Sequence, residues 1–237
     1  MHGVTRIFDL LNLAGQNYKS GEPVLVGKKD GKVFSADSSA YKKNCFKLAQ
    51  ALLNSGIKQG DRVATIINNR PEWNYFDMAI SLIGAVQVPV YPTISEEHIR
   101  FIFNDSQISG LVVNDAKVWN RVRTMVNEMP FVKLIISIDK TEELTSLAEI
   151  LKKNQASYPS EEVTGISKNI KPSDLFSINY TSGTTGRPKG VMLSHQNLIS
   201  NFTALTGILK QQPAKRAVSV LPLCHIYERI LNYTYQN

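Results

Sequence analysis

The stretch NYTSGTTGRPKGVMLSHQN, residues 179–197, joins a glycine-rich loop to the start of a helix. Residues 181–190 hold three glycines, four hydroxyl side chains and a single lysine. Glycine lets the backbone approach a ligand closely and adopt positive φ, and consecutive N–H groups in such a loop form a nest for an anion. Hydroxyls add donors, and a lysine supplies a point charge suited to a phosphate. The stretch therefore predicts a site for the β and γ phosphates of a nucleoside triphosphate.

The residues expected to bind these phosphates all come from this loop. Pro188 stiffens it and biases Arg187 toward an extended backbone. The spacing differs from a P-loop, because two residues separate Gly186 from Lys189 and no Ser or Thr follows the lysine. A flexible surface turn is the alternative interpretation. The predicted phosphate ligands are Thr181, Ser182, Gly183, Thr184, Thr185, Gly186, Lys189 and Gly190.

Apolar strand segments alternate with amphipathic helical segments on the N-terminal side of the loop. Strands are expected at 61–69, 86–91, 110–114, 132–138 and 174–180, and helices at 71–85, 95–107, 115–128 and 141–154. The strand segments are nearly continuously apolar, as buried parallel strands are. This alternation is typical of a sheet covered by helices on both faces. The sequence thus predicts an α/β fold with a doubly wound, mostly parallel sheet.

The segments around this alternating region complete the predicted order of elements. Residues 38–62 are expected to form one amphipathic helix closed by Gly56, and the polar segment 155–172 a loop or linker. After the glycine-rich loop, 191–194 should be a short strand, and Ser194 should cap a helix from about 195 to 210. Residues 217–223 are expected to form the last strand.

Charge and cysteine content narrow the classes of function. The 27 Lys and Arg against 20 Asp and Glu give a net charge of +7, yet no basic run exceeds two residues. A nucleic-acid partner is therefore not expected. The most apolar stretch is too short for a transmembrane segment, while peripheral membrane contact and a homo-oligomer remain open. Cys45 and Cys224 fit no metal or redox spacing, which favours a reducing compartment, the cytoplasm.

Two motifs resemble a known family. The segment YTSGTTGRPKGVMLSHQN is similar to the phosphate-loop signature of the adenylate-forming superfamily, which comprises acyl- and aryl-CoA synthetases, luciferases and peptide-synthetase adenylation domains. LPLCHIYER, at 221–229, resembles a segment of the long-chain fatty acyl-CoA synthetases, and the weaker stretches 56–64, 68–73 and 88–93 point to the same branch. The resemblance covers about residues 33–233. Cys224 and Phe34 depart from it, where a small residue and Trp are usual.

The resemblance implies a two-step reaction and the substrates for it. A fatty-acid carboxylate would attack the α-phosphate of ATP, giving acyl-adenylate and pyrophosphate, and the thiol of coenzyme A would then displace AMP. ATP, Mg²⁺ and coenzyme A are thus expected. An enzyme for another acid or acceptor is one alternative, and a non-catalytic nucleotide-binding module is another.

The same resemblance implies roles for individual residues. Lys189 and His225 are the catalytic candidates: the lysine would stabilise charge on the pyrophosphate, and the histidine would bind the substrate carboxylate. Thr181 would share Mg²⁺ with a glutamate outside this sequence. Four further expectations concern structure rather than catalysis. They are capping or packing by His195, an ion pair between Glu228 and Arg229, and core positions for Trp73 and Tyr227.

The resemblance also implies that the domain continues beyond these residues. Residues 1–55 should pack with a second sheet lying mostly outside the sequence, 56–223 should form the first sheet, and 224–237 should begin the region of the second. The C-terminal domain is expected to be absent and the 237-residue chain inactive by itself. The loop at 182–188 should be mobile without ATP. Five apolar side chains are expected to lack partners: Phe8, Leu10, Leu11, Val24 and Leu25.

Overall fold

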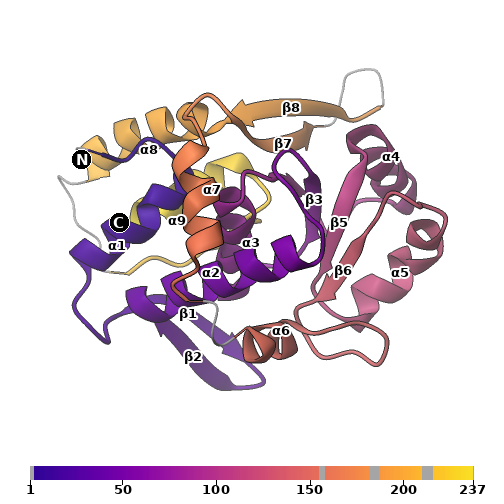
Figure 1. Cartoon of the computed structure of the whole chain (residues 1–237), viewed down its shortest axis with the longest axis horizontal. Helices are drawn as coiled ribbons and strands as arrows, with labels where there is room; N and C mark the ends of the chain where they lie inside the picture. Colours follow the sequence, from indigo (N-terminus) through magenta and orange to yellow (C-terminus); the bar gives the residue numbers. More distant parts are fainter. Residues whose placement is uncertain (1–2, 155–157, 182–186, 210–215, 237) are drawn as a thin grey trace.

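A six-stranded sheet lies at the centre of the computed structural model, which describes residues 3–154, 158–181, 187–209 and 216–236 (Figure 1). The strand order is β6-β5-β3-β4-β7-β8. Neighbouring strands are parallel except β7 and β8, which are antiparallel. The strands are β3 (Arg62–Ile66), β4 (Val86–Pro89), β5 (Ile108–Val113), β6 (Leu134–Ser137), β7 (Leu175–Thr181) and β8 (Lys189–Ser194).

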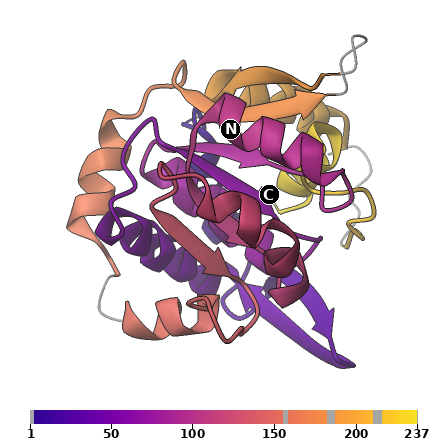
Figure 2. The same ribbon diagram turned by 90° about the vertical axis from the view of Figure 1, so that its right-hand side faces the viewer.

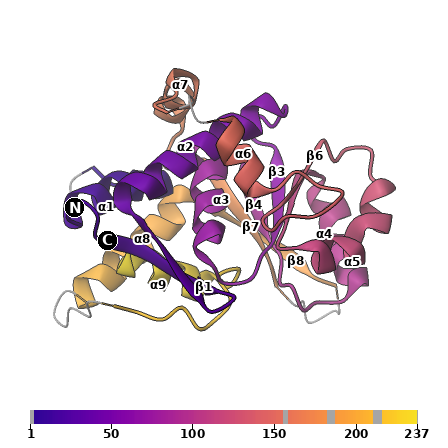
Figure 3. The ribbon, with the colours of Figure 1, turned by 90° about the horizontal axis from the view of Figure 1, so that it is seen from below.

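Helices cover both faces of this sheet. Figure 3 shows α2 (Ser38–Asn54) and α3 (Pro71–Leu82) on one side, and α4 (Glu96–Ser106) and α5 (Ala116–Asn127) on the other. Each pair covers its own apolar core. Because connections run along both faces, the sheet is doubly wound, and the predicted fold class is confirmed. In the described ranges, none of the helices combines the length and hydropathy needed to cross a bilayer.

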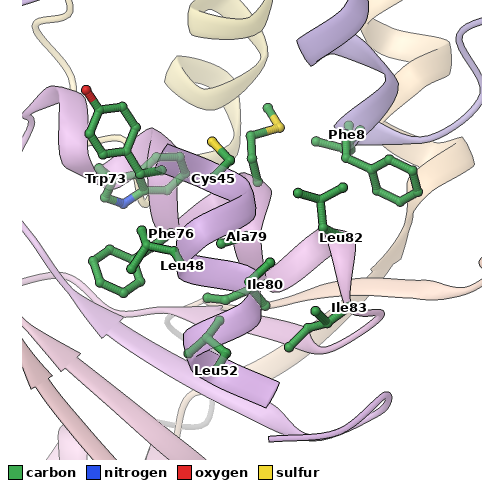
Figure 4. Close-up of a cluster of buried hydrophobic side chains, with 14 of the residues drawn as sticks. Phe8, Cys45, Leu48, Leu52, Trp73, Phe76, Ala79, Ile80, Leu82 and Ile83 are labelled. Carbon is green, nitrogen blue, oxygen red and sulfur yellow. The ribbon is translucent and has the colours of Figure 1, made fainter. Parts of the chain in front are cut away.

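The larger core forms around α3, because this helix is buried on all sides. Every residue of α3 except Glu72 is buried, and Pro71 occupies its first turn, where a missing N–H costs nothing. Figure 4 shows side chains of α2, such as Leu48 and Leu52, beside Phe76 and Ile80 of α3. The helices over the second core begin at capping side chains: Ser95 accepts the N–H of His98 at the start of α4, and Asp115 accepts the N–H of Val118 at the start of α5.

The N-terminal segment is packed against the larger core, around α3. It comprises η1 (Ile7–Asp9), α1 (Leu10–Asn17) and an antiparallel hairpin of β1 (Pro23–Lys29) and β2 (Lys32–Asp37), which projects from the body (Figure 2). The expectation that its apolar side chains lack partners is wrong. They pack with α2 and α3 of this chain, so that four are buried and one half-buried: Phe8, Leu10, Leu11, Leu25 and, half-buried, Val24.

Two predictions between residues 141 and 172 are wrong, one on the extent of a helix and one on a segment expected to be a loop. Only α6 (Leu147–Lys153) is helical in the first segment. The residues before α6 lie beside the end of β6 instead, because the N–H of Ser137 in β6 donates to the carbonyl of Thr145. The segment predicted to be a loop contains α7 (Glu161–Asn169). Ser160 caps this helix by accepting the N–H of Val163, and two glutamates follow in its first turn.

The C-terminal elements agree with the prediction in part. Ser194 accepts the N–H of Asn197 at the start of α8 (His195–Leu209), as predicted, and α9 (Ile226–Tyr235) follows. Residues 217–223 are not a strand. The backbone of this segment pairs with a side chain rather than with a neighbouring strand. Backbone groups of 221 and 223 are bonded by the side chain of Asn69.

Candidate functional site

The base of the glycine-rich loop is an antiparallel strand pair. Thr181, the last residue of β7, lies opposite Lys189, the first of β8, and both are exposed. Cross-strand partners have Cβ atoms about 4.5–5.5 Å apart and side chains on the same face, so the Thr181 hydroxyl and the Lys189 ammonium can reach the same ligand. This donor set suits a phosphate oxygen. Gly190, next to Lys189, is likewise exposed. The other predicted ligands, and the expected mobility of the loop, lie outside the described residues: Ser182, Gly183, Thr184, Thr185 and Gly186.

The two faces of β7 have different roles. On one face, the Tyr180 hydroxyl donates to Asp105 of α4 at 2.5 Å, and its ring meets Phe101 edge-on. Burial raises the pKa of Tyr180, and the bond to Asp105 adds to the effect. This face anchors the strand. Ser177, Asn179 and Thr181 alternate with it and share the opposite face, because side chains in a strand alternate with a period of two.

His225 stands at the start of α9, beyond that second face of β7. Its ring is exposed, and Nδ1 accepts the N–H of Tyr227 at 3.2 Å as the N-cap of the helix. Since Nδ1 is an acceptor, the neutral ring carries its proton on Nε2 and can donate it to a substrate oxygen. Asn179 donates to the carbonyl of Cys224 at 3.4 Å. The two predicted motifs are therefore joined directly by a hydrogen bond.

Cys224 is a packing residue in this motif. Its side chain is buried, and burial raises the pKa of the thiol to about 12. A cysteine with such a pKa stays protonated at neutral pH and is unreactive. The Cys224 side chain, which is larger than the residue usual at this position, therefore fills core volume below His225.

Arg229 ties α9 to the centre of the sheet. It is fully buried and forms an ion pair with Asp77 of α3. The nitrogen that bonds Asp77, Nη2, also donates to Gln87 of β4 at 2.5 Å, while Nη1 donates to Ser177 of β7 at 3.0 Å and Nε to Tyr233 at 2.8 Å. A register irregularity between 175 and 177 presents Phe176 to Arg229 as well as Ser177, and the ring lies 4.3 Å from the guanidinium carbon.

Three structural expectations are resolved by this packing. The predicted ion pair between Glu228 and Arg229 is wrong, because adjacent residues of a helix do not face each other and Asp77 is the partner of the arginine. Trp73 is a core residue, as predicted, with its ring 5.3 Å from the guanidinium carbon. Tyr227 is not, since 57% of it is exposed.

His195 has the structural role predicted for it. The residue is buried between Phe8 and Phe176, and its Nδ1 accepts the N–H of Ile7 at 3.1 Å. Burial lowers the pKa of the ring to about 4. The ring is therefore neutral at physiological pH and joins η1 to the start of α8.

The described residues offer few ligands to a metal. Within them, no group of three or more His, Cys, Asp or Glu side chains is placed to hold an ion. Mg²⁺ bound with a nucleotide takes much of its coordination from phosphates and water, and needs only one or two protein ligands. A single hydroxyl, that of Thr181, is consistent with such an ion.

Sequence reasoning missed four polar residues of the site: Asn69, Asp77, Gln87 and Asn179. A signal for Asn179 existed, since the spacing of 177, 179 and 181 puts three polar side chains on one face of a strand. Asn69 lies within the segment NNRPEW, whose resemblance to the family indicates no role for an individual residue. Asp77 and Gln87 carry no local signal, because their partner lies more than 140 residues away.

Solved structures share this arrangement of sheet and helices. A protein from Rhodopseudomonas palustris with a provisional assignment as long-chain-fatty-acid CoA ligase superposes with a TM-score of 0.80 at 24% identity, covering 98% of this chain and 55% of that one. For the N-terminal domain of FACL13 from Mycobacterium tuberculosis the TM-score is 0.74 at 23% identity, with 98% and 55% covered. The chain thus shares the fold of these two proteins.

Sequence comparison gives the family. Residues 20–235 match the AMP-binding enzyme family, and the chain belongs to it. Long chain acyl-CoA synthetase 6, peroxisomal, of Arabidopsis thaliana is 36% identical over 188 residues, 77% of this chain and 27% of the relative. Long-chain-fatty-acid--CoA ligase 5 of Rattus norvegicus is 33% identical over 199 residues, 78% and 29% respectively. The chain thus spans less than a third of the length of these two relatives.

Proposed function

We propose that this chain is the phosphate-binding part of an AMP-forming ligase that activates a long-chain fatty acid with ATP and transfers it to coenzyme A. One observation carries the proposal. Thr181 and Lys189 pair across the base of the glycine-rich loop, and Asn179, which shares the face of β7 with Thr181, donates to the carbonyl of Cys224, the residue before His225. The names of the curated relatives support the choice of acid and of acceptor.

Lys189 and Thr181 would act on the phosphates. As the acyl carboxylate attacks the α-phosphate, negative charge develops on the departing pyrophosphate, and an ammonium placed beside it lowers the barrier. Thr181 would help to hold Mg²⁺, which would supply positive charge against the developing negative charge of the phosphates. Ser182, Gly183, Thr184, Thr185, Gly186 and Gly190 would contribute further donors from the loop.

His225 would act on the acid rather than on the nucleotide. Its Nε2–H can donate to a carboxylate oxygen and hold it in line with the phosphorus, which is mainly a gain in orientation. The ring sits at a helix N-terminus, where a negative charge is stabilised. Both features favour binding of an anionic oxygen at this position.

The domain limits and the compartment belong to the same proposal. Residues 56–223 would form the first sheet, while 1–55 and 224–237 would meet a second sheet outside this sequence. Two relatives in Arabidopsis are named peroxisomal. Buried thiols fit any reducing compartment, so the cytoplasm and the peroxisome are the two candidate locations.

ATP–pyrophosphate exchange tests the proposal directly. The protein in its complete natural length should exchange label only when a fatty acid is present, and more strongly with long-chain than with short-chain or aryl acids. The 237-residue chain alone should show no fatty-acid-dependent AMP release. ATP binding by the complete protein without exchange for any acid would contradict the proposal and indicate a non-catalytic nucleotide-binding module.

A further inference from the structure

Asn69 pairs with the backbone of the segment that leads to His225. Its amide nitrogen donates to the carbonyl of Leu221 at 2.7 Å and to the hydroxyl of Ser219 at 2.9 Å. Its amide oxygen accepts the N–H of Leu223 at 2.9 Å. One side chain thus satisfies a C=O and an N–H two residues apart, as a neighbouring strand would.

The support behind Asn69 is rigid. The residue follows β3, a central strand of the sheet. The N–H of Asn68, before it, donates to the side chain of Asn114 after β5 at 3.3 Å. Arg70, after it, makes two bonds of 3.0 Å to Glu72 and one of 3.0 Å to Asp139. The turn that carries Asn69 is therefore fixed on both sides.

The segment that Asn69 holds is otherwise weakly attached. Val218 is 84% exposed and Val220 is 77% exposed, and the segment belongs to no described strand. From Leu223 onward the chain is tightly defined. Cys224 is buried, and its carbonyl accepts a hydrogen bond from the Asn179 side chain. The N–H of His225 donates to the carbonyl of Pro222 at 2.8 Å. Asn69 therefore acts at the junction between a loose segment and an ordered turn.

We propose that Asn69 is a positioning residue that places His225 for the reaction of the acyl carboxylate. The inference rests on the role proposed above for His225. Through Leu223, Asn69 fixes the turn that begins α9, and that turn sets the position of the imidazole relative to Thr181 and Lys189. The mechanism requires no contact between Asn69 and a substrate.

Amide hydrogen exchange on the 237-residue chain tests the placement without any catalysis. Asn69→Ala should speed exchange at Leu223, which loses its acceptor, and at Tyr227, whose acceptor is the displaced His225 ring. Loss of one such hydrogen bond corresponds to roughly five- to tenfold faster exchange. Asn68→Ala is the matched control, because it removes an adjacent exposed amide and leaves the backbone bond to Asn114 intact. Unchanged exchange at Tyr227 in Asn69→Ala would overturn the inference.

A double-mutant cycle on the protein in its complete natural length tests the consequence. Asn69→Ala should lower kcat of fatty-acid-dependent exchange about tenfold and change the KM for ATP by less than about twofold. In a His225→Ala background the same change should have little further effect, because residues that act through one another are not additive. An equal loss in both backgrounds would contradict the inference. If the wild-type protein activated no acid, the proposed function would be refuted. The amide hydrogen exchange data would still decide whether Asn69 positions His225.

Discussion

At the residue scale, Lys189 combines exposure with a defined strand register. Lys189→Ala should reduce ATP–pyrophosphate exchange by roughly ten- to a hundredfold, because one charge-assisted contact contributes about 1.5–3 kcal/mol. The free energy of unfolding should change by less than about 0.5 kcal/mol, since the side chain is exposed. Lys32→Ala, an exposed lysine of the β1–β2 hairpin, serves as control and should leave exchange unchanged. A loss equal in both variants would refute the phosphate role of Lys189.

His195 makes stability depend on pH. Its pKa is lowered from 6.5 to about 4 in the folded chain, so the unfolded chain binds more protons between these values. Stability from this residue is therefore complete above pH 6.5 and is lost as pH falls toward 4, by about 3 kcal/mol. His195→Gln can still accept the N–H of Ile7 but does not titrate. Urea unfolding of both proteins from pH 4 to pH 7 should give curves that diverge over this range; parallel curves would contradict the prediction.

At the scale of elements, α7 depends strongly on its N-cap residue, which precedes the helix. Ser160 caps the helix and also donates its hydroxyl to Gln50 of α2 at 2.6 Å. Ser160→Ala should lower the free energy of unfolding by about 1–2 kcal/mol, since a cap and an interhelix bond are lost together. Ser167→Ala, in the same helix, should cost less than about 0.5 kcal/mol. Thermal unfolding of the two variants separates the outcomes, and equal shifts would argue against the cap.

The β7–β8 pair is the element that positions the site. β7 is parallel to β4, and β8 returns antiparallel at the edge of the sheet. A tight return places the two ends of the glycine-rich loop in register, which a crossover helix could not do. The apolar composition of residues 174–180 predicts the strand. Its partner strands and its register depend on how the other strands are arranged in the folded sheet.

At the scale of the whole molecule, the buried pair of Arg229 and Asp77 joins α9, α3, β4 and β7. Arg229→Met leaves a buried carboxylate without its partner and should destabilise the fold by about 3–5 kcal/mol. The double variant with Asp77→Leu should recover most of this loss, because no charge remains buried. Arg100→Met breaks an exposed pair with Glu128 and should cost less than about 1 kcal/mol. Urea unfolding measures all three, and a double variant as unstable as Arg229→Met would contradict this account.

Local patterns in the sequence determined most elements of this protein. The alternation of apolar strands and amphipathic helices, the capping residues Ser95 and Ser194, and Pro71 at a helix start each depend on a few neighbouring residues. The candidate phosphate site was predictable for the same reason, because a glycine-rich loop carries its donors within ten residues. The short helix α7 was missed, since nine residues carry too weak a periodicity to distinguish it from a polar linker.

Only the tertiary structure decided the partners of Arg229, the burial of the N-terminal segment and the irregular course of residues 217–223. Each depends on groups far apart in the chain: Asp77 with Arg229, Ile7 with His195, and Asn69 with Leu223. A buried arginine must find a carboxylate, and an unpaired backbone segment must find donors and acceptors, but composition does not say which. Packing chooses them, because only the folded sheet and its helices bring those groups within hydrogen-bonding distance.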